Sequence, residues 1–291
     1  MLAAAYEWQV RTADVSTAFL HAQVEGEVYV RPPKHLQLER PGEVWRLKRA
    51  LYGLRSAPRS WQQHAAQVLG ALGWERMQVD TSVYRKLGAN GEPAGMVVLY
   101  VDDVLAAGEP DELGGFYDKF AAEVVLKTQE PLQEGGKEKY LGVEIERTKN
   151  GFRLDASEYT EKLVADAGLQ NCKPVATPGL AATRCDDSRK LSKSEHSEYR
   201  RRVGQLLWLA NARKDLCFAV KELSRHVHDP TEQDARACKR VLRYLRGTQH
   251  CKVPLSPCVR DGAFTLEVYS DSDWAGCGES RRSTSGGRIM L

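Results

Sequence analysis

The sequence lacks the features that mark secreted and membrane-spanning proteins. Its 291 residues contain no apolar run near the ~20 residues that a helix needs to cross a bilayer. The opening stretch MLAAAYEWQVR has no basic start followed by an apolar core, so it predicts no secretory signal. These absences favour a chain that works inside the cell, and we expect no membrane partner.

Cysteine and histidine offer little for a disulfide framework or a metal site. The seven cysteines are odd in number and include no CxxC pair, which argues against paired disulfides and against zinc. His226 and His228 could ligate a metal, but an isolated HxH after a helix is more typical of surface or capping residues. We therefore assign no function to the cysteines.

The sequence also has no large excess of charge of one sign. The 42 basic residues against 39 acidic ones leave a net charge of +3, too even to require an anionic partner by itself. An anionic partner would have to be inferred from local clusters of basic residues. The apolar fraction of 42% and the charged fraction of 28% are ordinary for globular proteins, which excludes wholesale disorder. The length suits one large domain or two of ordinary size.

Short strands and helices alternate in the first part of the chain. Hydrophobic spacing predicts a strand over 7–15 and a helix that begins at Ser56, with Pro58 in its first turn. A long apolar run covers 96–108, and a second amphipathic helix follows it. A β-hairpin with an Asn150–Gly151 turn comes next.

The later part of the chain reads as mainly helical. A helix is expected over 157–168, and the segment over 171–190, which has two prolines and no periodicity, predicts a linker. Thr231 is the expected N-cap of the last of three further helices. These three helices are expected at about 195–210, 214–227 and 231–246. A new strand unit begins at about 262.

Two adjacent aspartates interrupt the apolar run MVVLYVDDVLAAG. Burying an unpaired carboxylate costs much free energy, so the position of Asp102 and Asp103 within an apolar run requires a structural or functional explanation. They could form the turn between two strands, which is compatible with a functional site because a turn presents both carboxylates at a hairpin tip. Two like charges side by side also favour a cation between them, and Mg²⁺ prefers such ligands. Asp14, which closes an early strand, could complete a two-metal site for attack at phosphorus.

Three strings of sequence occur in the order and spacing of a reverse transcriptase palm. They are TADVSTAFL at 12–20, LKRALYGLRSAPRSW at 47–61 and LYVDDVLAAG at 99–108, and they resemble the copia-type retrotransposon reverse transcriptases. The resemblance continues through YLGVEIER to YSDSDWAG and covers essentially the whole chain.

This resemblance implies an α+β fold. Residues 1–170 would form the palm, an antiparallel sheet with helices on one face and with most of the fingers region missing. After the linker, 191–250 would form a helical thumb-like or connection region. Residues 262–291 would begin a truncated ribonuclease H-like unit.

The resemblance also assigns roles to individual residues. Asp14, Asp102 and Asp103 match the catalytic aspartates that hold two Mg²⁺ or Mn²⁺ ions, and Asp271 matches the first metal-binding aspartate of the ribonuclease H fold. Phe19 matches the aromatic residue that excludes a 2′-hydroxyl, with a core residue as the alternative. The expected nucleotide-binding residues are Thr17, Ala18, Phe19, Tyr52, Gly53 and Pro58.

Basic residues are candidates for contact with nucleic acid. Arg55 and Arg59 could reach phosphates or could be solvated charges at a helix start. Five further basic residues fall on one helix face, which could bind a duplex or could be a solvated face favoured by the helix dipole. This basic stripe consists of Arg236, Lys239, Arg240, Arg243 and Arg246.

The expected function is that of an RNA-directed DNA polymerase of a copia-type LTR retrotransposon. A primer 3′-hydroxyl would attack a deoxynucleoside triphosphate, with an RNA or DNA template, the primer duplex and other parts of a Pol polyprotein as partners. The expected location is the cytoplasmic virus-like particle, with the nucleus as an alternative. The alternative hypothesis is a non-catalytic remnant that folds and binds nucleic acid. A third hypothesis is a metal-dependent phosphohydrolase.

Overall fold

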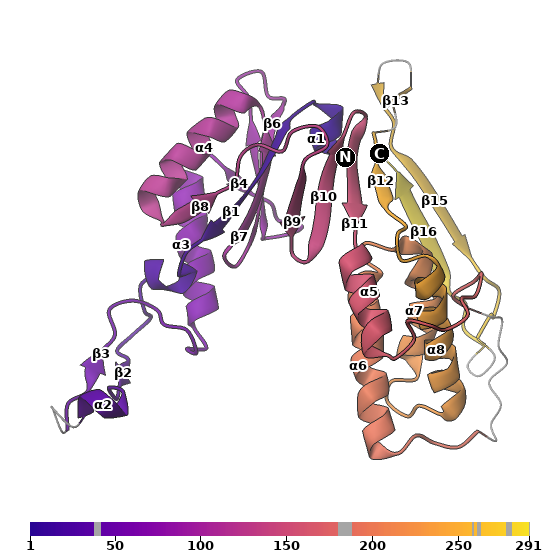
Figure 1. Ribbon diagram of the computed structural model, residues 1–291. Helices are drawn as coiled ribbons and strands as arrows, with labels where there is room; N and C mark the ends of the chain where they lie inside the picture. Colours follow the sequence, from indigo (N-terminus) through magenta and orange to yellow (C-terminus); the bar gives the residue numbers. More distant parts are fainter. Residues whose placement is uncertain (38–41, 180–187, 258, 261–262, 278–280, 291) are drawn as a thin grey trace. The chain divides into compact units, whose positions relative to one another are not determined.

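The computed structural model describes all residues except 38–41, 180–187, 258, 261–262, 278–280 and 291 (Figure 1). The chain divides into two compact units. One is Tyr6–Gln133 with Leu2, and the other is Glu134–Leu291 with Met1 and Ala3–Ala5. In the described part of the chain, no helix combines the length and the apolar character needed to cross a membrane.

The first unit is built on a six-stranded sheet in the order β4-β5-β6-β7-β1-β8. Every neighbouring pair in it is antiparallel. The strands are β1 (Gln9–Val15), β4 (Glu75–Arg76), β5 (Val83–Leu87), β6 (Pro93–Tyr100), β7 (Asp103–Gly108) and β8 (Leu126–Thr128). The predicted strand over 7–15 and the apolar run over 96–108 are therefore present, the latter as the hairpin β6–β7.

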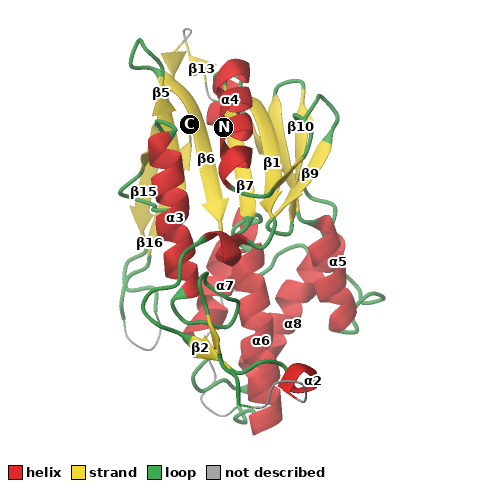
Figure 2. Cartoon of the chain, turned by 90° about the vertical axis from the view of Figure 1, so that its left-hand side faces the viewer, coloured by secondary structure: helices red, strands yellow, loops and turns green. Residues whose placement is uncertain are grey.

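Two helices cover one face of this sheet, α3 (Ala57–Ala71) and α4 (Pro110–Glu123) (Figure 2). Successive residues of β7 point to opposite faces of the sheet. Val104 and Ala106 are fully buried against the helices, whereas Asp103 points to the opposite face. Mixed helix and antiparallel sheet is thus confirmed. The first unit also contains the short elements η1 (Ala18–His21), β2 (Tyr29–Val30), α2 (Lys34–Gln37) and β3 (Trp45–Arg46), whereas the short helix α1 (Leu2–Ala5) is grouped mostly with the second unit.

The second unit contains a four-stranded antiparallel sheet in the order β12-β11-β10-β9. Its strands are β9 (Lys137–Tyr140), β10 (Val143–Thr148), β11 (Gly151–Asp155) and β12 (Val253–Leu255). The predicted hairpin is present, but Thr148 pairs with Gly151, so Lys149 and Asn150 form its loop and Gly151 is already in the strand.

The strands of this sheet belong to the second unit, which places the end of the first unit before β9. Its last strand, β12, comes from near residue 253, so β9, β10 and β11 pack with the later part of the chain. The compact units consequently part after Gln133 and not at the predicted palm boundary of 170. The assignment of 1–170 to a palm, of 171–190 to a linker and of the rest to later regions stays a prediction.

Four helices form the core of the second unit (Figure 1). They are α5 (Ser157–Asp166), α6 (Lys193–Leu209), α7 (Cys217–Arg225) and α8 (Glu232–Gly247), with a 3-10 turn η2 (Lys214–Leu216) before α7. Thr231 is the N-cap residue of α8, as predicted, and its amide donates to the carboxylate of Asp234 at 2.7 Å as one arm of a capping box.

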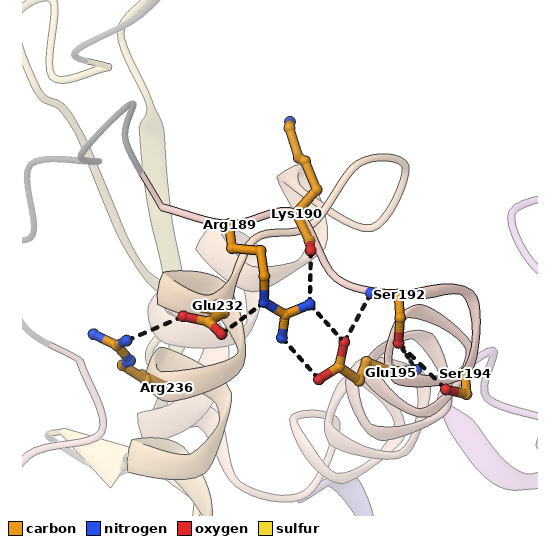
Figure 3. A network of polar contacts seen from close by, with 7 residues as sticks. All are labelled: Arg189, Lys190, Ser192, Ser194, Glu195, Glu232 and Arg236. Atoms are coloured by element: carbon orange, nitrogen blue, oxygen red, sulfur yellow. Dashed lines mark hydrogen bonds and ion pairs between the residues drawn. The ribbon is translucent and has the colours of Figure 1, made fainter.

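A network of charges joins the starts of α6 and α8 (Figure 3). Arg189 donates to both oxygens of Glu195 at 3.0 and 3.1 Å, and its Nε donates to Glu232 at 2.9 Å. Hydrogen bonds from Arg189 and Ser192 hold the pKa of Glu195 at about 2. The network therefore fastens the chain before α6 to the first turns of both helices.

Two-stranded ribbons complete the second unit. They are formed by β13 (Val259–Arg260) with β14 (Ala263–Phe264), and by β15 (Glu267–Ser272) with β16 (Ser285–Met290). The strand unit predicted from about residue 262 is thus represented by β15 and its partner. Its assignment to a ribonuclease H-like fold stays a prediction.

Candidate active site

The adjacent aspartates lie where the β6–β7 hairpin turns. Tyr100 pairs with Asp103, which leaves Val101 and Asp102 as a two-residue loop. The turn that the sequence predicted at this point is therefore confirmed. Asp103 is the first residue of β7, and both carboxylates are half-buried.

Asp14 joins them from the neighbouring strand. It is the cross-strand partner of Asp103, and the next amide along β1, that of Val15, donates to the carbonyl of Asp102 at 2.7 Å. Asp14 and Asp103 thus occupy a non-hydrogen-bonded position of the ladder, where opposing side chains share a face and lie closest. Asp14 and Asp103 therefore share the face of the sheet away from α3 and α4, and Asp102 lies in the adjoining hairpin loop at the same end of the sheet.

The electrostatics of Asp103 reflect this crowding. Burial raises the pKa of Asp103 above its ordinary value, and the charges of Asp102 and Asp14 raise it further. A divalent cation would relieve this repulsion, and carboxylate oxygens are the donors that Mg²⁺ and Mn²⁺ prefer. The donor chemistry fits such an ion. Across the described residues, however, no three His, Cys, Asp or Glu side chains already converge as a metal-binding group.

Two aromatic residues from separate predicted motifs contact one another. Phe19, in η1, packs against Tyr52 with ring centroids 4.6 Å apart. Ala18 is fully buried, whereas Thr17 is exposed with a left-handed φ of 53°. The structure therefore brings together two of the predicted nucleotide-binding residues, which come from separate motifs.

The second motif leads into α3. Gly53 has a φ of +97°, and a Cβ added there would meet nothing within 4 Å, so its backbone conformation is what favours glycine. Pro58 lies in the first turn of α3, as predicted. Arg55 and Arg59 are exposed, and neither has an ion-pair partner within the described ranges.

The basic stripe on α8 is largely occupied by the chain itself. Arg243 donates to the carbonyl of Lys173 at 2.9 Å, Arg246 to that of Gln170 at 2.6 Å, and Arg240 to the hydroxyl of Thr177 at 2.9 Å. Three of the five residues of the basic stripe thus bind the segment 170–177. Arg236 pairs with Glu232, and Lys239 is exposed without a partner in the part of the chain that the structure describes.

Asp271 lies far along the sequence from the other predicted metal ligands. It pairs with Gly286 in the ribbon β15–β16, is exposed, and accepts a hydrogen bond from the amide of Ser272. The nearby Asp273 accepts a hydrogen bond from the amide of Thr284. Among the described residues, Asp271 belongs to no group of three or more His, Cys, Asp or Glu side chains that could hold a metal ion.

Two residues at the site were not identified from the sequence. Lys127 of β8 is the cross-strand partner of Asp14 on the side away from Asp103, so it shares their face of the sheet. Trp61 of α3 donates its indole N–H to the carbonyl of Val101 at 2.6 Å. Lys127 could not be identified because its strand has only three residues and shows no alternation of polar and apolar residues. The helical spacing of Trp61 predicted only that it is a core residue of its helix.

Comparisons with known proteins show the family to which the chain belongs. The family model described as "Reverse transcriptase (RNA-dependent DNA polymerase)" matches residues 1–181. The chain is 34% and 35% identical, over 98% of its length, to the retrovirus-related Pol polyproteins from transposons RE1 and RE2 of Arabidopsis thaliana. It covers only 19% of each of those proteins. It is also 29% identical to a putative transposon Ty5-1 protein of Saccharomyces cerevisiae, covering 88% of that relative.

Proposed function

Because the chain belongs to the reverse transcriptase family and is similar to copia-type Pol polyproteins, we propose that it carries the polymerase site of such a retrotransposon. The observation that carries the proposal is the pairing of Asp14 with Asp103 across β1 and β7, with Asp102 in the adjoining loop. The reaction would join a deoxynucleoside triphosphate to a primer 3′-hydroxyl on an RNA template.

Asp14, Asp102 and Asp103 would hold two divalent cations, Mg²⁺ or Mn²⁺. Such ions supply activation of the attacking hydroxyl and charge stabilisation at the departing pyrophosphate. The protein contributes three carboxylates fixed by a strand pair and a hairpin loop, and the repulsion at Asp103 disfavours their joint ionisation without a cation. No side chain has to act as a general base.

Phe19 and Tyr52 would form the sugar side of the nucleotide site. Their rings are packed together, so Phe19 is restrained from moving aside when a 2′-hydroxyl approaches. Thr17 and Ala18 precede Phe19 and would present backbone to the triphosphate. Selection for deoxynucleotides then follows from steric exclusion.

Template and primer would be held by exposed cations. Arg55 and Arg59 lie at the start of α3, and both are exposed. On α8 the free charge is Lys239, since the other basic residues of the stripe already have partners. We propose further that Asp271 starts a ribonuclease H-like unit, that other Pol segments are partners, and that copying takes place in a cytoplasmic particle or the nucleus.

A non-catalytic remnant that binds nucleic acid is the second candidate. It is favoured by one observation, that the described residues hold no three side chains converged as a metal-binding group. Primer extension on an RNA template with Mg²⁺ or Mn²⁺, run beside salt-dependent binding of the same duplex, separates the two. Extension supports the polymerase, whereas salt-sensitive binding without extension supports the remnant.

A further inference from the structure

The loop between β6 and β7 holds a valine in a conformation that valine rarely adopts. Val101 has a φ of 56°, a left-handed value that is strongly disfavoured for a β-branched residue. A two-residue loop with positive φ at its first residue alone follows the type II′ pattern, which favours glycine there. The Val101 side chain is 39% exposed, so full burial does not compensate for this conformation.

Two hydrogen bonds hold the peptide groups on either side of Asp102. The indole Nε1 of Trp61 donates to the carbonyl of Val101 at 2.6 Å, and the amide of Val15 donates to the carbonyl of Asp102 at 2.7 Å. The first bond anchors the loop to α3, and the second anchors it to β1 beside Asp14. Hydrogen bonds from α3 and from β1 therefore hold the backbone on both sides of Asp102.

Trp61 is itself held firmly. Its side chain is 2% exposed in the core of the first unit, and the rings of His21 and His64 lie near it, with centroids 6.2 and 6.0 Å away. A buried indole N–H requires a hydrogen-bond acceptor, and the Val101 carbonyl provides it. The loop conformation and the orientation of Trp61 therefore support each other.

We propose that Trp61 is a positioning residue for the carboxylate site. By holding the Val101 carbonyl it keeps the strained loop in the one conformation that places Asp102 and Asp103 beside Asp14. Trp61 acts through the loop and touches no substrate. This inference rests on the proposed polymerase function, in which the fixed carboxylates hold the metal ions.

Trp61→Phe tests the proposal, because it keeps a buried aromatic ring and removes the indole N–H. Trp74→Phe is the matched control, since Trp74 is 3% exposed in the same core and packs against Phe116, away from the loop. Amide hydrogen exchange is read at Val15, with Arg11 of the same strand as an internal reference. We expect Trp61→Phe to speed exchange at Val15 about tenfold more than at Arg11, and Trp74→Phe to show no such difference.

Equal acceleration at Val15 and Arg11, or none, in Trp61→Phe would overturn the proposal. A second readout is primer extension, in which Trp61→Phe should lower kcat about tenfold and leave the KM for the nucleotide within twofold. The control should keep both values. If the unaltered chain extends no primer, the proposed function fails, while exchange at Val15 still decides whether Trp61 holds the loop.

Discussion

A partly buried ion cluster in the second unit makes the unfolding free energy depend on pH. Lys252 donates to Glu146 and to Asp155, both at 3.0 Å, and the two carboxylates are only 16% and 11% exposed. Burial alone would raise the pKa of Asp155, but hydrogen bonds from Ser157 and Lys252 outweigh it and hold the pKa at about 2. Hydrogen bonds from Lys252 likewise lower the pKa of Glu146.

The sign of the effect follows from linkage. A carboxyl whose pKa is lower in the folded chain than its ordinary value of 3.8 stabilises the fold above that value and loses this contribution as the pH falls toward 2. For Asp155 the shift from 3.8 to about 2 corresponds to at most about 2.5 kcal/mol, at ~1.4 kcal/mol per pKa unit. The unfolding free energy should therefore fall between pH 4 and pH 2.

Lys252→Met isolates the contribution of the lysine. It leaves two partly buried carboxylates without their shared cation, so we expect a loss of about 2 kcal/mol at pH 7. The loss should shrink between pH 4 and pH 2 as the carboxylates take up protons. Urea unfolding followed by circular dichroism across this range measures both quantities. Lys139→Met, which breaks the exposed pair of Lys139 with Glu158, is the control and should change little. A loss that is absent at pH 7, or unchanged at pH 2, would refute the reasoning.

Three further predictions concern other parts of the chain. Thr231→Ala removes one arm of the α8 capping box and should lower the unfolding free energy by about 1 kcal/mol, measured by urea unfolding. Gly95→Ala places a Cβ 2.9 Å from the Trp74 ring and 3.1 Å from the Ala107 carbonyl, so thermal unfolding should show a loss of about 1–3 kcal/mol. Lys239→Gln should reduce the salt dependence of duplex binding, whereas Arg243→Gln should chiefly lower stability, because Arg243 already binds the Lys173 carbonyl.

Local patterns in the sequence were sufficient for several of the elements and for the hairpin that carries Asp102 and Asp103. The apolar run broken by two aspartates predicted the β6–β7 hairpin, and Thr231 predicted the start of α8. Asp14 could be linked to the pair because it ends a strand, and the resemblance to reverse transcriptases supplied the spacing. These features depend on residues within one turn, one helix or one motif.

Contacts between distant parts of the chain could not be read in this way. Arg243 and Arg246 looked like free positive charges, but they donate to carbonyls 70 and 76 residues earlier. Trp61 reaches the Val101 carbonyl across 40 residues. The pairing of β8 with β1, which sets Lys127 beside Asp14, rests on three residues with no periodicity. Helical spacing shows which residues share a face but not what covers that face.

Single-nucleotide incorporation with Mg²⁺ or Mn²⁺ on a primed RNA template tests the central claim most directly. The unaltered chain is compared with Asp103→Asn and with Asp118→Asn, an exposed aspartate of α4 in the same unit. Metal-dependent incorporation that Asp103→Asn abolishes and Asp118→Asn retains is the predicted result. Incorporation that survives in Asp103→Asn would contradict the assignment of the carboxylate pair as the polymerase site.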